Sequence, residues 1–424
     1  MSSWIWTEAS MNSRHGMKQR IVIVGAGQSG ARTAASLRKQ GCTDEIILIG
    51  DEAELPYERP PLSKDILGGA PLSGTIIFPP EYYTKHDIDV RMDTRVSEID
   101  PASRQIVFAD ASRLVYDHLV LATGVRARRL ALPGAELDGV LTLRTAQDST
   151  RLFARLTTGA RIVILGGGFL GLEIAAAAVK RGCAVTVVES AVVLLGRILG
   201  GFLGERLAEL HRSHGVDVRT NARIKAIDGE GSVSAIVLED GATIPADTVV
   251  VAVGALANDE LAKGAGVECA DGVLVDAHTR TSVAGIYAVG DVARQRERWS
   301  AMAVRLESWE NAELQAQAAA CTILGVPASG DPAPWFWTDQ YDQNIQILGG
   351  CEPDDDVVMR GDAAAPSWCA FFVRRGRLHG AVLMNAGRER RIVKQIMDTR
   401  QIVDCGVLGD PGRPLKSLVI SRQS

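Results

Sequence analysis

Short apolar runs that end in glycine recur along the chain, and each is followed by a stretch of helix-forming residues. The run at 21–24 leads through glycines into 31–39, and the run at 161–165 leads in the same way into 172–180. A continuously apolar run is typical of a strand buried on both faces, as in a parallel sheet. Runs of this kind, alternating with helical stretches, predict an α/β protein with two Rossmann-like units.

Glycines at a fixed spacing follow both runs. We call these two sets of glycines the first fingerprint, with Gly25, Gly27 and Gly30, and the second fingerprint, with Gly166, Gly168 and Gly171. Between a buried strand and a helix start, backbone amides and the helix dipole can hold a pyrophosphate. One set alone is weak evidence, because glycines also serve ordinary tight turns. Two sets, each with an acidic residue about 20 positions on, predict two bound dinucleotides, a flavin (FAD) and a nicotinamide (NADH).

Each unit carries a carboxylate after its second strand. The strand at 45–49 precedes Asp51 and Glu52, and either could bind ribose hydroxyls or merely cap the turn. The strand at 184–188 ends at Glu189, which can accept from an adenosine ribose and would repel a 2′-phosphate. The two residues after it supply no arginine that could hold such a phosphate. The sequence therefore favours NADH over NADPH.

Other segments place ligand-binding residue types beside buried strands. The proline-rich segment 55–64 predicts a rigid loop that presents Arg59 and Lys64. These two cations suit an anionic ligand, and the alternative is that both are simply solvated. Three further buried runs end in a turn that can approach a ligand. The first ends at Thr123 and Gly124, the second at Gly254 and the third at Asp291.

The residue composition and the pattern of predicted elements change near residue 331. An aromatic cluster at 335–341 contains Trp335 and Trp337, and strand-like runs and a helical segment at 387–397 follow it. This pattern predicts a C-terminal α+β domain of about 90 residues, within the usual size range of domains. Its tryptophans either belong to a core or contribute to a site.

Composition narrows the function classes. The 424 residues carry a net charge of −5, with 46% hydrophobic and 23% charged residues, which excludes a nucleic-acid binder. Seven scattered cysteines without a CxxC spacing indicate a reduced, cytoplasmic protein with no metal site. The apolar runs are too short to span a bilayer. Residues 1–18 lack the apolar core of a signal peptide and are expected to be a disordered extension.

At this point the sequence resembles a known family, the FAD-dependent NADH:ferredoxin reductases of Rieske oxygenase and bacterial cytochrome P450 systems, which have a glutathione-reductase-like fold. The resemblance covers residues 19 to about 418. It rests on five blocks in family order, at 55–64, 122–124, 285–291, 305–311 and 334–341.

The resemblance implies an FAD-binding domain at 19–142 and 256–329, an NAD-binding domain at 143–255 and a C-terminal reductase domain at 330–424. It implies that the first glycines, Arg59, Lys64 and Asp291 bind FAD, and that the second glycines, Glu189 and Arg197 bind NADH. Trp309, Trp335 and Trp337 would lie at the flavin edge. The resemblance also pairs Lys64 with Glu173. We expect Glu173 in the first turn of the helix that follows the second fingerprint. The alternative is that Glu173 only complements the N-terminus of its own helix.

The segment 55–64 has no cysteine, whereas the disulfide-reductase branch carries its redox pair beside the flavin. Electrons must therefore leave for another molecule, and the resemblance implies a [2Fe-2S] ferredoxin that feeds an oxygenase of aromatic hydrocarbon catabolism. Rubredoxin, a quinone or a small oxidant is the alternative acceptor, and a non-catalytic NADH sensor is a third class. Two arginine-rich stretches, at 294–305 and 388–394, are the candidate docking faces. We expect a monomer or a homodimer.

Overall fold

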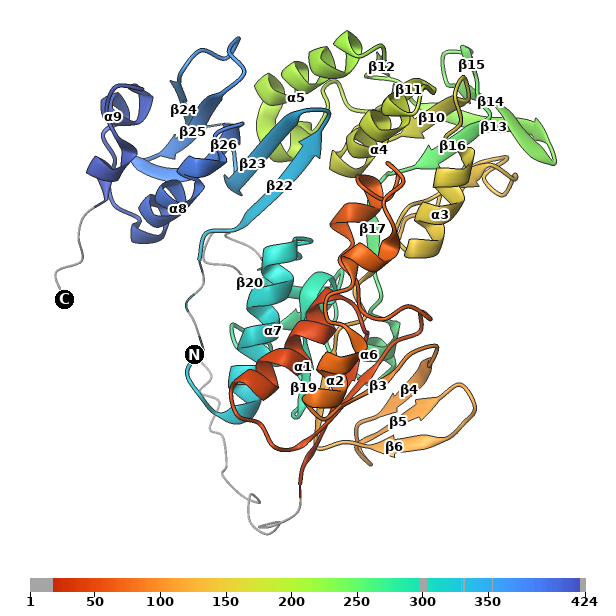
Figure 1. Ribbon diagram of the computed structural model, residues 1–424, viewed down its shortest axis with the longest axis vertical. Helices are drawn as coiled ribbons and strands as arrows, with labels where there is room; N and C mark the ends of the chain where they lie inside the picture. Colours follow the sequence, from red (N-terminus) through yellow and green to blue (C-terminus); the bar gives the residue numbers. More distant parts are fainter. Residues whose placement is uncertain (1–17, 297–302, 329, 331, 353, 420–424) are drawn as a thin grey trace.

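The structure is a computed structural model that describes residues 18–296, 303–328, 330, 332–352 and 354–419, without the side chains of 197–200, 202 and 296. Two Rossmann-like units lie one above the other, and a third domain lies beside the upper unit (Figure 1). The expected α/β fold class is confirmed. The expected extension at 1–18 falls, except for Lys18, outside the described residues. No helix in the described part is long and apolar enough to cross a bilayer.

The lower unit is built on a parallel sheet with strand order β19-β7-β1-β2-β3. Its strands are β1 (Arg20–Val24), β2 (Glu45–Ile49), β3 (Ile88–Arg91), β7 (His118–Leu121) and β19 (Ile286–Ala288). One face carries α1 (Gln28–Lys39), α2 (Pro80–Lys85) and α7 (Trp309–Leu324), and the other carries the antiparallel strands β4 (Val96–Asp100), β5 (Gln105–Phe108) and β6 (Arg113–Val115). Ile21 and Ile23 face the helices, while Val22 and Val24 face β4 and β5. Both faces are covered, which is why the run is apolar throughout.

The upper unit repeats this plan with strand order β12-β11-β10-β16-β9. Its strands are β9 (Val140–Leu141), β10 (Arg161–Leu165), β11 (Ala184–Val188), β12 (Asp217–Arg219) and β16 (Thr248–Val251). One face carries α3 (Ala146–Arg155), α4 (Phe169–Lys180) and α5 (Gly196–Ser213), and the other carries β13 (Ile224–Glu230), β14 (Ser232–Leu238) and β15 (Thr243–Pro245). The sheet takes in β9, just before the expected domain start at 143, and the exact domain bounds stay a prediction.

The C-terminal domain has an antiparallel sheet with order β22-β23-β26-β25-β24. Its elements are β22 (Trp335–Gln340), β23 (Gln343–Gly349), β24 (Asp356–Arg360), β25 (Trp368–Arg374), β26 (Arg377–Met384), the 3-10 helices η4 (Gly387–Glu389) and η5 (Leu415–Leu418), α8 (Arg390–Thr399) and α9 (Cys405–Gly409). One face of the sheet packs on α8 and α9, and the other contributes Ile345, Ile347 and Trp368 to the core of the upper unit. The third domain is thus attached to the upper unit through a shared core.

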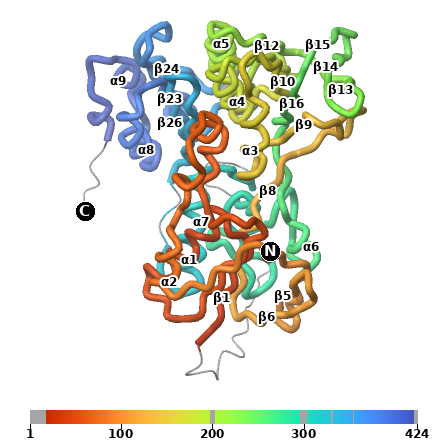
Figure 2. The backbone as a smooth tube through the Cα atoms, turned by 45° about the vertical axis from the view of Figure 1, so that its right-hand side comes forward, coloured from red at the N-terminus to blue at the C-terminus, as the bar shows by residue number. Residues whose placement is uncertain are grey.

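The chain passes between the two Rossmann-like units twice. The two passages, β8 (Val125–Ala127) and β17 (Ala255–Ala257), pair with each other as antiparallel strands. Figure 2 shows β8 between the two units. The remaining short elements are η1 (Pro60–Ser63), η2 (Leu72–Thr75), α6 (Glu260–Gly264), β18 (Val273–Val275), η3 (Gly290–Val292), β20 (Ala293–Arg296) and β21 (Ala303–Val304).

Both fingerprint helices begin three residues earlier than the helix-forming stretches indicated. They start at Gln28 and Phe169, directly after the second glycine of each set, so the third glycine lies inside the first turn. Two consequences for the site follow. The third glycine packs the helix against the strand end, and Glu173 moves from the first turn of its helix to the second.

Candidate functional site

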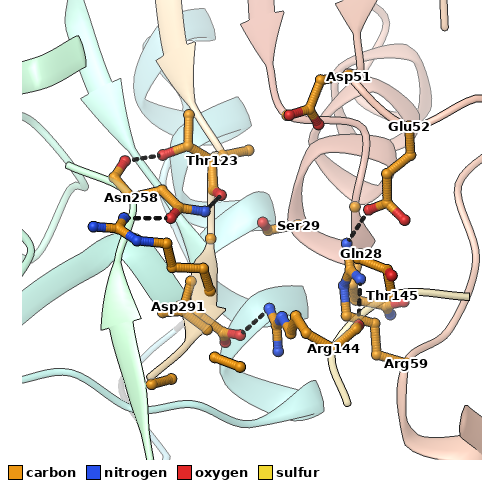
Figure 3. Close-up of a pocket in the computed structure, with 18 of the residues that line it drawn as sticks. Gln28, Ser29, Asp51, Glu52, Arg59, Thr123, Arg144, Thr145, Asn258 and Asp291 are labelled. Atoms are coloured by element: carbon orange, nitrogen blue, oxygen red, sulfur yellow. Dashed lines mark hydrogen bonds and ion pairs between the residues drawn. The ribbon is translucent and has the colours of Figure 1, made fainter. Parts of the chain in front are cut away.

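A cavity of about 1620 Å³ extends from the first fingerprint to the second. It opens at the carboxyl ends of β1, β2 and β7, reaches the start of α4 and the end of β16, and is bordered by η1, η3 and the start of α7. Figure 3 shows the part of it near the first fingerprint, where residues that follow β1, β2, β7 and β19 converge. The carboxyl edge of a parallel sheet is where such folds bind ligands.

The glycines of the first fingerprint have different roles. A Cβ on Gly25 would lie 2.1 Å from the Ala122 carbonyl oxygen, and one on Gly30 would lie 1.9 Å from the Gly25 carbonyl oxygen. These two glycines let β1, β7 and α1 approach one another. A Cβ on Gly27 would meet nothing within 4 Å, and Gly27 lines the cavity. The second glycine is therefore the one that leaves room for a phosphate beside the helix N-terminus.

The second fingerprint repeats this geometry. A Cβ on Gly166 would lie 2.4 Å from the Ala252 carbonyl oxygen, one on Gly171 would lie 2.1 Å from the Gly166 carbonyl oxygen, and one on Gly168 would meet nothing within 4 Å. Gly168 lines the same cavity. The structure thus gives both predicted dinucleotide sites the same backbone cradle.

The two acidic residues after β2 differ in their partners. The Glu52 carboxylate accepts from Arg59 Nη2 at 2.6 Å and from the Tyr57 hydroxyl at 2.5 Å. Asp51 is exposed, lines the cavity and has no partner among the described residues. Of the two candidates that the sequence left open, Asp51 is the one that is free to accept from a ribose.

Arg59 and Asp291 meet through a residue that the sequence did not single out. Arg59 Nη1 donates to the Arg144 carbonyl oxygen at 2.7 Å, and Arg144 Nη2 donates to Asp291 Oδ2 at 2.9 Å (Figure 3). Arg144 lies between the two units, where no motif or periodicity marks it. Its Nε and the Oε1 of Gln28 are buried in the cavity wall without partners among the described residues. Unsatisfied buried donors and acceptors of this kind fit a large, polar, phosphate-bearing ligand such as FAD.

The connection between the units forms part of the same wall. Thr123 Oγ1 donates to the Asn258 carbonyl oxygen at 2.7 Å, and Asn258 Nδ2 donates to the Thr123 carbonyl oxygen at 2.8 Å. Gly124 and Gly254 have φ of +63° and +100°, and both line the cavity. Asn258 is a second residue that sequence reasoning missed. Its partner lies 135 residues away, so no local pattern could have marked it.

The Lys64–Glu173 ion pair is present. Lys64 Nζ lies 3.3 Å from Glu173 Oε1 and 3.6 Å from Asp339 Oδ2. Ser63 Oγ donates to Glu173 Oε2 at 2.5 Å, and Thr338 Oγ1 donates to Oε1 at 2.7 Å. Burial raises the pKa of the Glu173 carboxyl, and Lys64 and the two hydroxyl donors oppose that rise.

The position of Glu173 corrects the sequence reading. It lies in the second turn of α4, not the first, and its carboxylate bonds to other segments rather than to its own helix N-terminus. It lines the cavity, whereas Lys64 lies directly behind it. Ser63 and Thr338 are further site residues that the sequence did not mark.

The three tryptophans form one half-buried cluster, and Trp335 also packs against the core of the C-terminal domain. Trp335 and Trp337 stack with centroids 5.2 Å apart, and Trp309 lies edge-on to Trp337 at 6.4 Å. Lys64 Nζ lies 5.3 Å from the Trp337 centroid. Trp309 lines the cavity, and Arg390 lies over Trp335 at 4.1 Å. The cluster therefore runs from the cavity wall to the exposed Arg390.

Glu189 lies against the second fingerprint. Its Oε2 accepts from the Gly167 amide at 2.8 Å and its Oε1 from the Ala191 amide at 2.7 Å. The carboxylate is thus fixed beside the glycine loop at the end of β11. Arg197 belongs to α5, and its side chain lies outside the described residues.

The two arginine-rich stretches differ. Arg294 and Arg305 both pair with Asp271, Arg305 also pairs with Glu307, and Arg298 falls outside the described residues. In the second stretch Arg388, Arg390 and Arg391 are exposed on η4 and α8, and Lys394 pairs with Glu310. No group of three metal-ligand side chains gathers anywhere in the described part of the chain.

Comparisons with known proteins agree with this geometry. Residues 19–316 match the family model of pyridine nucleotide-disulphide oxidoreductases, and residues 335–419 match that of the reductase C-terminal domain. The chain is 39% identical to the biphenyl dioxygenase system ferredoxin–NAD(+) reductase component of Paraburkholderia xenovorans, over 95% of this chain and 99% of that protein. It is 37% identical to a ferredoxin–NAD(P)(+) reductase of Sphingomonas sp., over 94% and 97%. The solved covalent putidaredoxin reductase–putidaredoxin complex is similar with a TM-score of 0.92 and 34% identity, over 95% of this chain and 98% of that one.

Proposed function

The chain belongs to the pyridine nucleotide-disulphide oxidoreductase family, and we propose that it is a ferredoxin–NAD(+) reductase that feeds an oxygenase acting on aromatic compounds. NADH gives up a hydride, two molecules of [2Fe-2S] ferredoxin each take one electron, and one proton is released. Bound FAD supplies the step between a hydride donor and one-electron acceptors. The observation that carries the proposal is that both fingerprints open into one cavity.

The cavity wall supports transfer to an external acceptor. No cysteine is among the described residues that line it, although the family takes its name from a redox disulfide. Ser63 and Lys64 lie beside Glu173, in the segment that carries the cysteine pair in the disulfide-reducing branch. Since no dithiol is among the described residues of this wall, electrons leave for an external acceptor, which we propose is a ferredoxin.

The residues have separate tasks in this proposal. Gly27, Asp51 and Asp291 hold the FAD phosphates, adenosine ribose and ribityl chain, and Arg59 and Arg144 tie the segments that surround them. The Lys64–Glu173 pair fixes the wall where nicotinamide and flavin meet. Trp309, Trp335 and Trp337 form the wall between this point and the protein surface, where ferredoxin docks.

Glu189 selects the nicotinamide cofactor. Its carboxylate is fixed beside Gly167 at the place where an adenosine ribose would lie. A 2′-phosphate there would meet a like charge and no described arginine partner, so NADH is the expected donor. We also propose a cytoplasmic location, because all seven cysteines are free thiols and the cytoplasm keeps thiols reduced.

Rapid mixing of the FAD-loaded protein with NADH, followed by ferredoxin, tests the proposal. We expect fast bleaching of the flavin, and turnover on adding a [2Fe-2S] ferredoxin. Turnover with rubredoxin or a quinone but not with ferredoxin would support the alternative acceptors. Slow bleaching without turnover on any acceptor would overturn the enzyme assignment in favour of an NADH sensor.

A further inference from the structure

A row of buried polar side chains lies between the upper Rossmann-like unit and the C-terminal domain. Thr338 and Gln340 on β22 and His211 on α5 are each 0% exposed. None of the three lines the cavity. Burying a polar group costs free energy unless the group is hydrogen-bonded. We therefore expect each of these three side chains to have a hydrogen-bond partner.

The row is one continuous hydrogen-bonded chain that ends at Glu173. Thr338 Oγ1 lies 2.7 Å from Glu173 Oε1, and Gln340 Nε2 lies 3.2 Å from Thr338 Oγ1. His211 Nε2 lies 3.0 Å from Gln340 Oε1, and the Tyr341 hydroxyl lies 3.0 Å from His211 Nδ1. Tyr341 and His211 mark the outer end, and the carboxylate in the cavity wall marks the inner end.

Every donor in this chain points toward Glu173. A carboxylate only accepts, so the Thr338 hydroxyl must donate to it, and the Gln340 amide nitrogen must donate to Thr338. The Gln340 amide oxygen then accepts from His211, which carries its proton on Nε2 and accepts from Tyr341 on Nδ1. Burial lowers the pKa of His211 to about 4, so the ring is neutral at physiological pH, as this direction requires.

The direction opposes a proton on Glu173 Oε1, the oxygen that faces Thr338. If Glu173 donated a proton to Thr338, the Thr338 hydroxyl would need another acceptor. Among the described residues, the other hydrogen-bond partner of this hydroxyl is the Gln340 amide nitrogen, which cannot accept. Reversal would require the amide to turn over and His211 to change tautomer, although both are fully buried.

We propose that Tyr341, His211, Gln340 and Thr338 are positioning residues that keep Glu173 a carboxylate directed at Lys64 in the wall where the two cofactors meet. The inference rests on the proposed function, and it ties the state of the cavity wall to the docking of the C-terminal domain. Removing the inner donors lets burial prevail, so that Glu173 takes up a proton at higher pH and Lys64 loses its partner.

Other ionisable groups face the same chain. Lys64 and Asp339 lie at the inner end, where Asp339 shares the Lys64 ammonium. At the outer end His214 stacks on Tyr341 at 3.7 Å, and Lys180 Nζ donates to the Tyr341 carbonyl oxygen at 3.0 Å. Asp339→Asn therefore serves as a matched variant that changes the charge near Lys64 and leaves the chain intact.

The direct test is a titration of Glu173 in the FAD-loaded protein by carbon-13 NMR, with glutamate labelled at the carboxyl carbon. The Glu173→Gln variant assigns the signal. We expect Thr338→Val, which has the same shape without the hydroxyl, to raise the Glu173 pKa by about one pH unit. Thr338→Ser keeps the hydroxyl and should restore the wild-type value.

Gln340→Glu tests the direction of the chain at nearly constant volume. Above its own pKa the introduced carboxyl cannot donate to Thr338, so the Thr338 hydroxyl gains a competing acceptor and Glu173 loses its donor. We expect a rise in the Glu173 pKa at least equal to that of Thr338→Val, and about half as much for Tyr341→Phe. An unchanged Glu173 pKa in Thr338→Val overturns the proposal, and that comparison stands even if Gln340→Glu fails to fold.

A second readout separates this inference from the proposed function. In Thr338→Val the acid limb of the pH profile for flavin reduction by NADH should move up with the Glu173 pKa, and in Thr338→Ser it should not. If NADH does not reduce the wild-type flavin, the proposed function fails while the NMR titration still tests the chain. If wild-type flavin reduction is fast but Thr338→Val changes neither the Glu173 pKa nor the pH profile, only the proposed role of the hydrogen-bonded side chains is refuted.

Discussion

The two Rossmann-like units have the same sheet plan and the same glycine geometry, yet their cofactor sites are covered differently. Around the first fingerprint, the cavity wall also includes η1, residues 142–145, η3 and the start of α7, which come from distant parts of the sequence. The upper unit contributes residues 142–145, Asp148, the start of α4 and the end of β16 to the cavity. More segments therefore surround the first fingerprint than the second.

This difference separates the two tasks of a cofactor site. The fingerprint supplies the phosphate cradle, and it is the same in both units. The covering segments decide how readily the occupant leaves, because each adds contacts that must be broken on release. The first fingerprint, which more segments cover, fits an FAD that is retained. The second, which fewer segments cover, fits an NADH that exchanges.

The largest expected effect comes from breaking the two cradles separately. In Gly30→Ala the new Cβ would meet the Gly25 carbonyl at 1.9 Å, which we expect to cost about 3 kcal/mol and to yield protein without FAD. Gly171→Ala, with the equivalent clash, should retain FAD and raise the Michaelis constant for NADH about tenfold or more. The flavin-to-protein absorbance ratio and steady-state kinetics measure both.

Gly74→Ala is the matched control, since a Cβ there meets nothing within 4 Å. The comparison fails if Gly171→Ala loses FAD as readily as Gly30→Ala does, because the number of covering segments would then not distinguish the sites.

The second prediction concerns the carboxylate that follows each second strand. Replacing Glu189 by alanine together with Ser190→Arg should shift the ratio of kcat/KM for NADPH over NADH about 100-fold, which corresponds to about 3 kcal/mol. Removing a like charge and adding a cation both favour the 2′-phosphate. Glu189→Gln is the control, because it removes the charge and keeps an acceptor for the Gly167 amide. A wild type that prefers NADPH would contradict this reading.

The third prediction concerns the place where the units meet. Lys64→Ala should slow flavin reduction by NADH about tenfold and leave FAD content nearly unchanged, because Lys64 contacts Glu173 and Asp339 but does not line the cavity. Rapid mixing measures the rate, and Asp339→Asn controls for a change of charge alone. An unchanged rate in Lys64→Ala would rule out a role for the pair in hydride transfer.

The smallest effect is expected outside both units. Charge reversal at the exposed Arg391 should raise the Michaelis constant for an acidic ferredoxin about threefold and leave that for NADH unchanged. Ferredoxin reduction should also fall with salt more steeply than ferricyanide reduction. Ferredoxin reduction that is insensitive to salt would favour an apolar contact at Trp335 and Trp337.

Local patterns predicted most of the fold. The buried runs, the glycine spacing and the acidic residues after the second strands gave both units, because these signals repeat within about 30 residues. The helix starts were wrong by three residues, since the helix-forming stretch begins only after the third glycine. Tertiary packing admits that glycine into the first turn, and propensity alone does not show it.

Local sequence patterns could not predict contacts between residues that are far apart in the sequence. Arg144 and Asp291 are 147 residues apart, and Thr338 and Glu173 are 165 apart. An isolated arginine or threonine carries no mark of such a partner. The ion pair of Lys64 with Glu173 was foreseen only through the family resemblance, and the turn on which Glu173 lies was misplaced.

The paired passages β8 and β17 bear on how the protein is made. The lower sheet is interrupted after β7 and receives its last strand, β19, only after residues 140–251 of the upper unit have been synthesised. Asp291, which follows β19, arrives later still. Because domains fold as the ribosome releases them, the inserted unit can finish before the unit that hosts it, and its ends are held together by the β8–β17 pair. The nascent chain therefore contains both glycine cradles before Asp291 and the start of α7 are synthesised, and the core that the upper unit shares with the C-terminal domain is completed last.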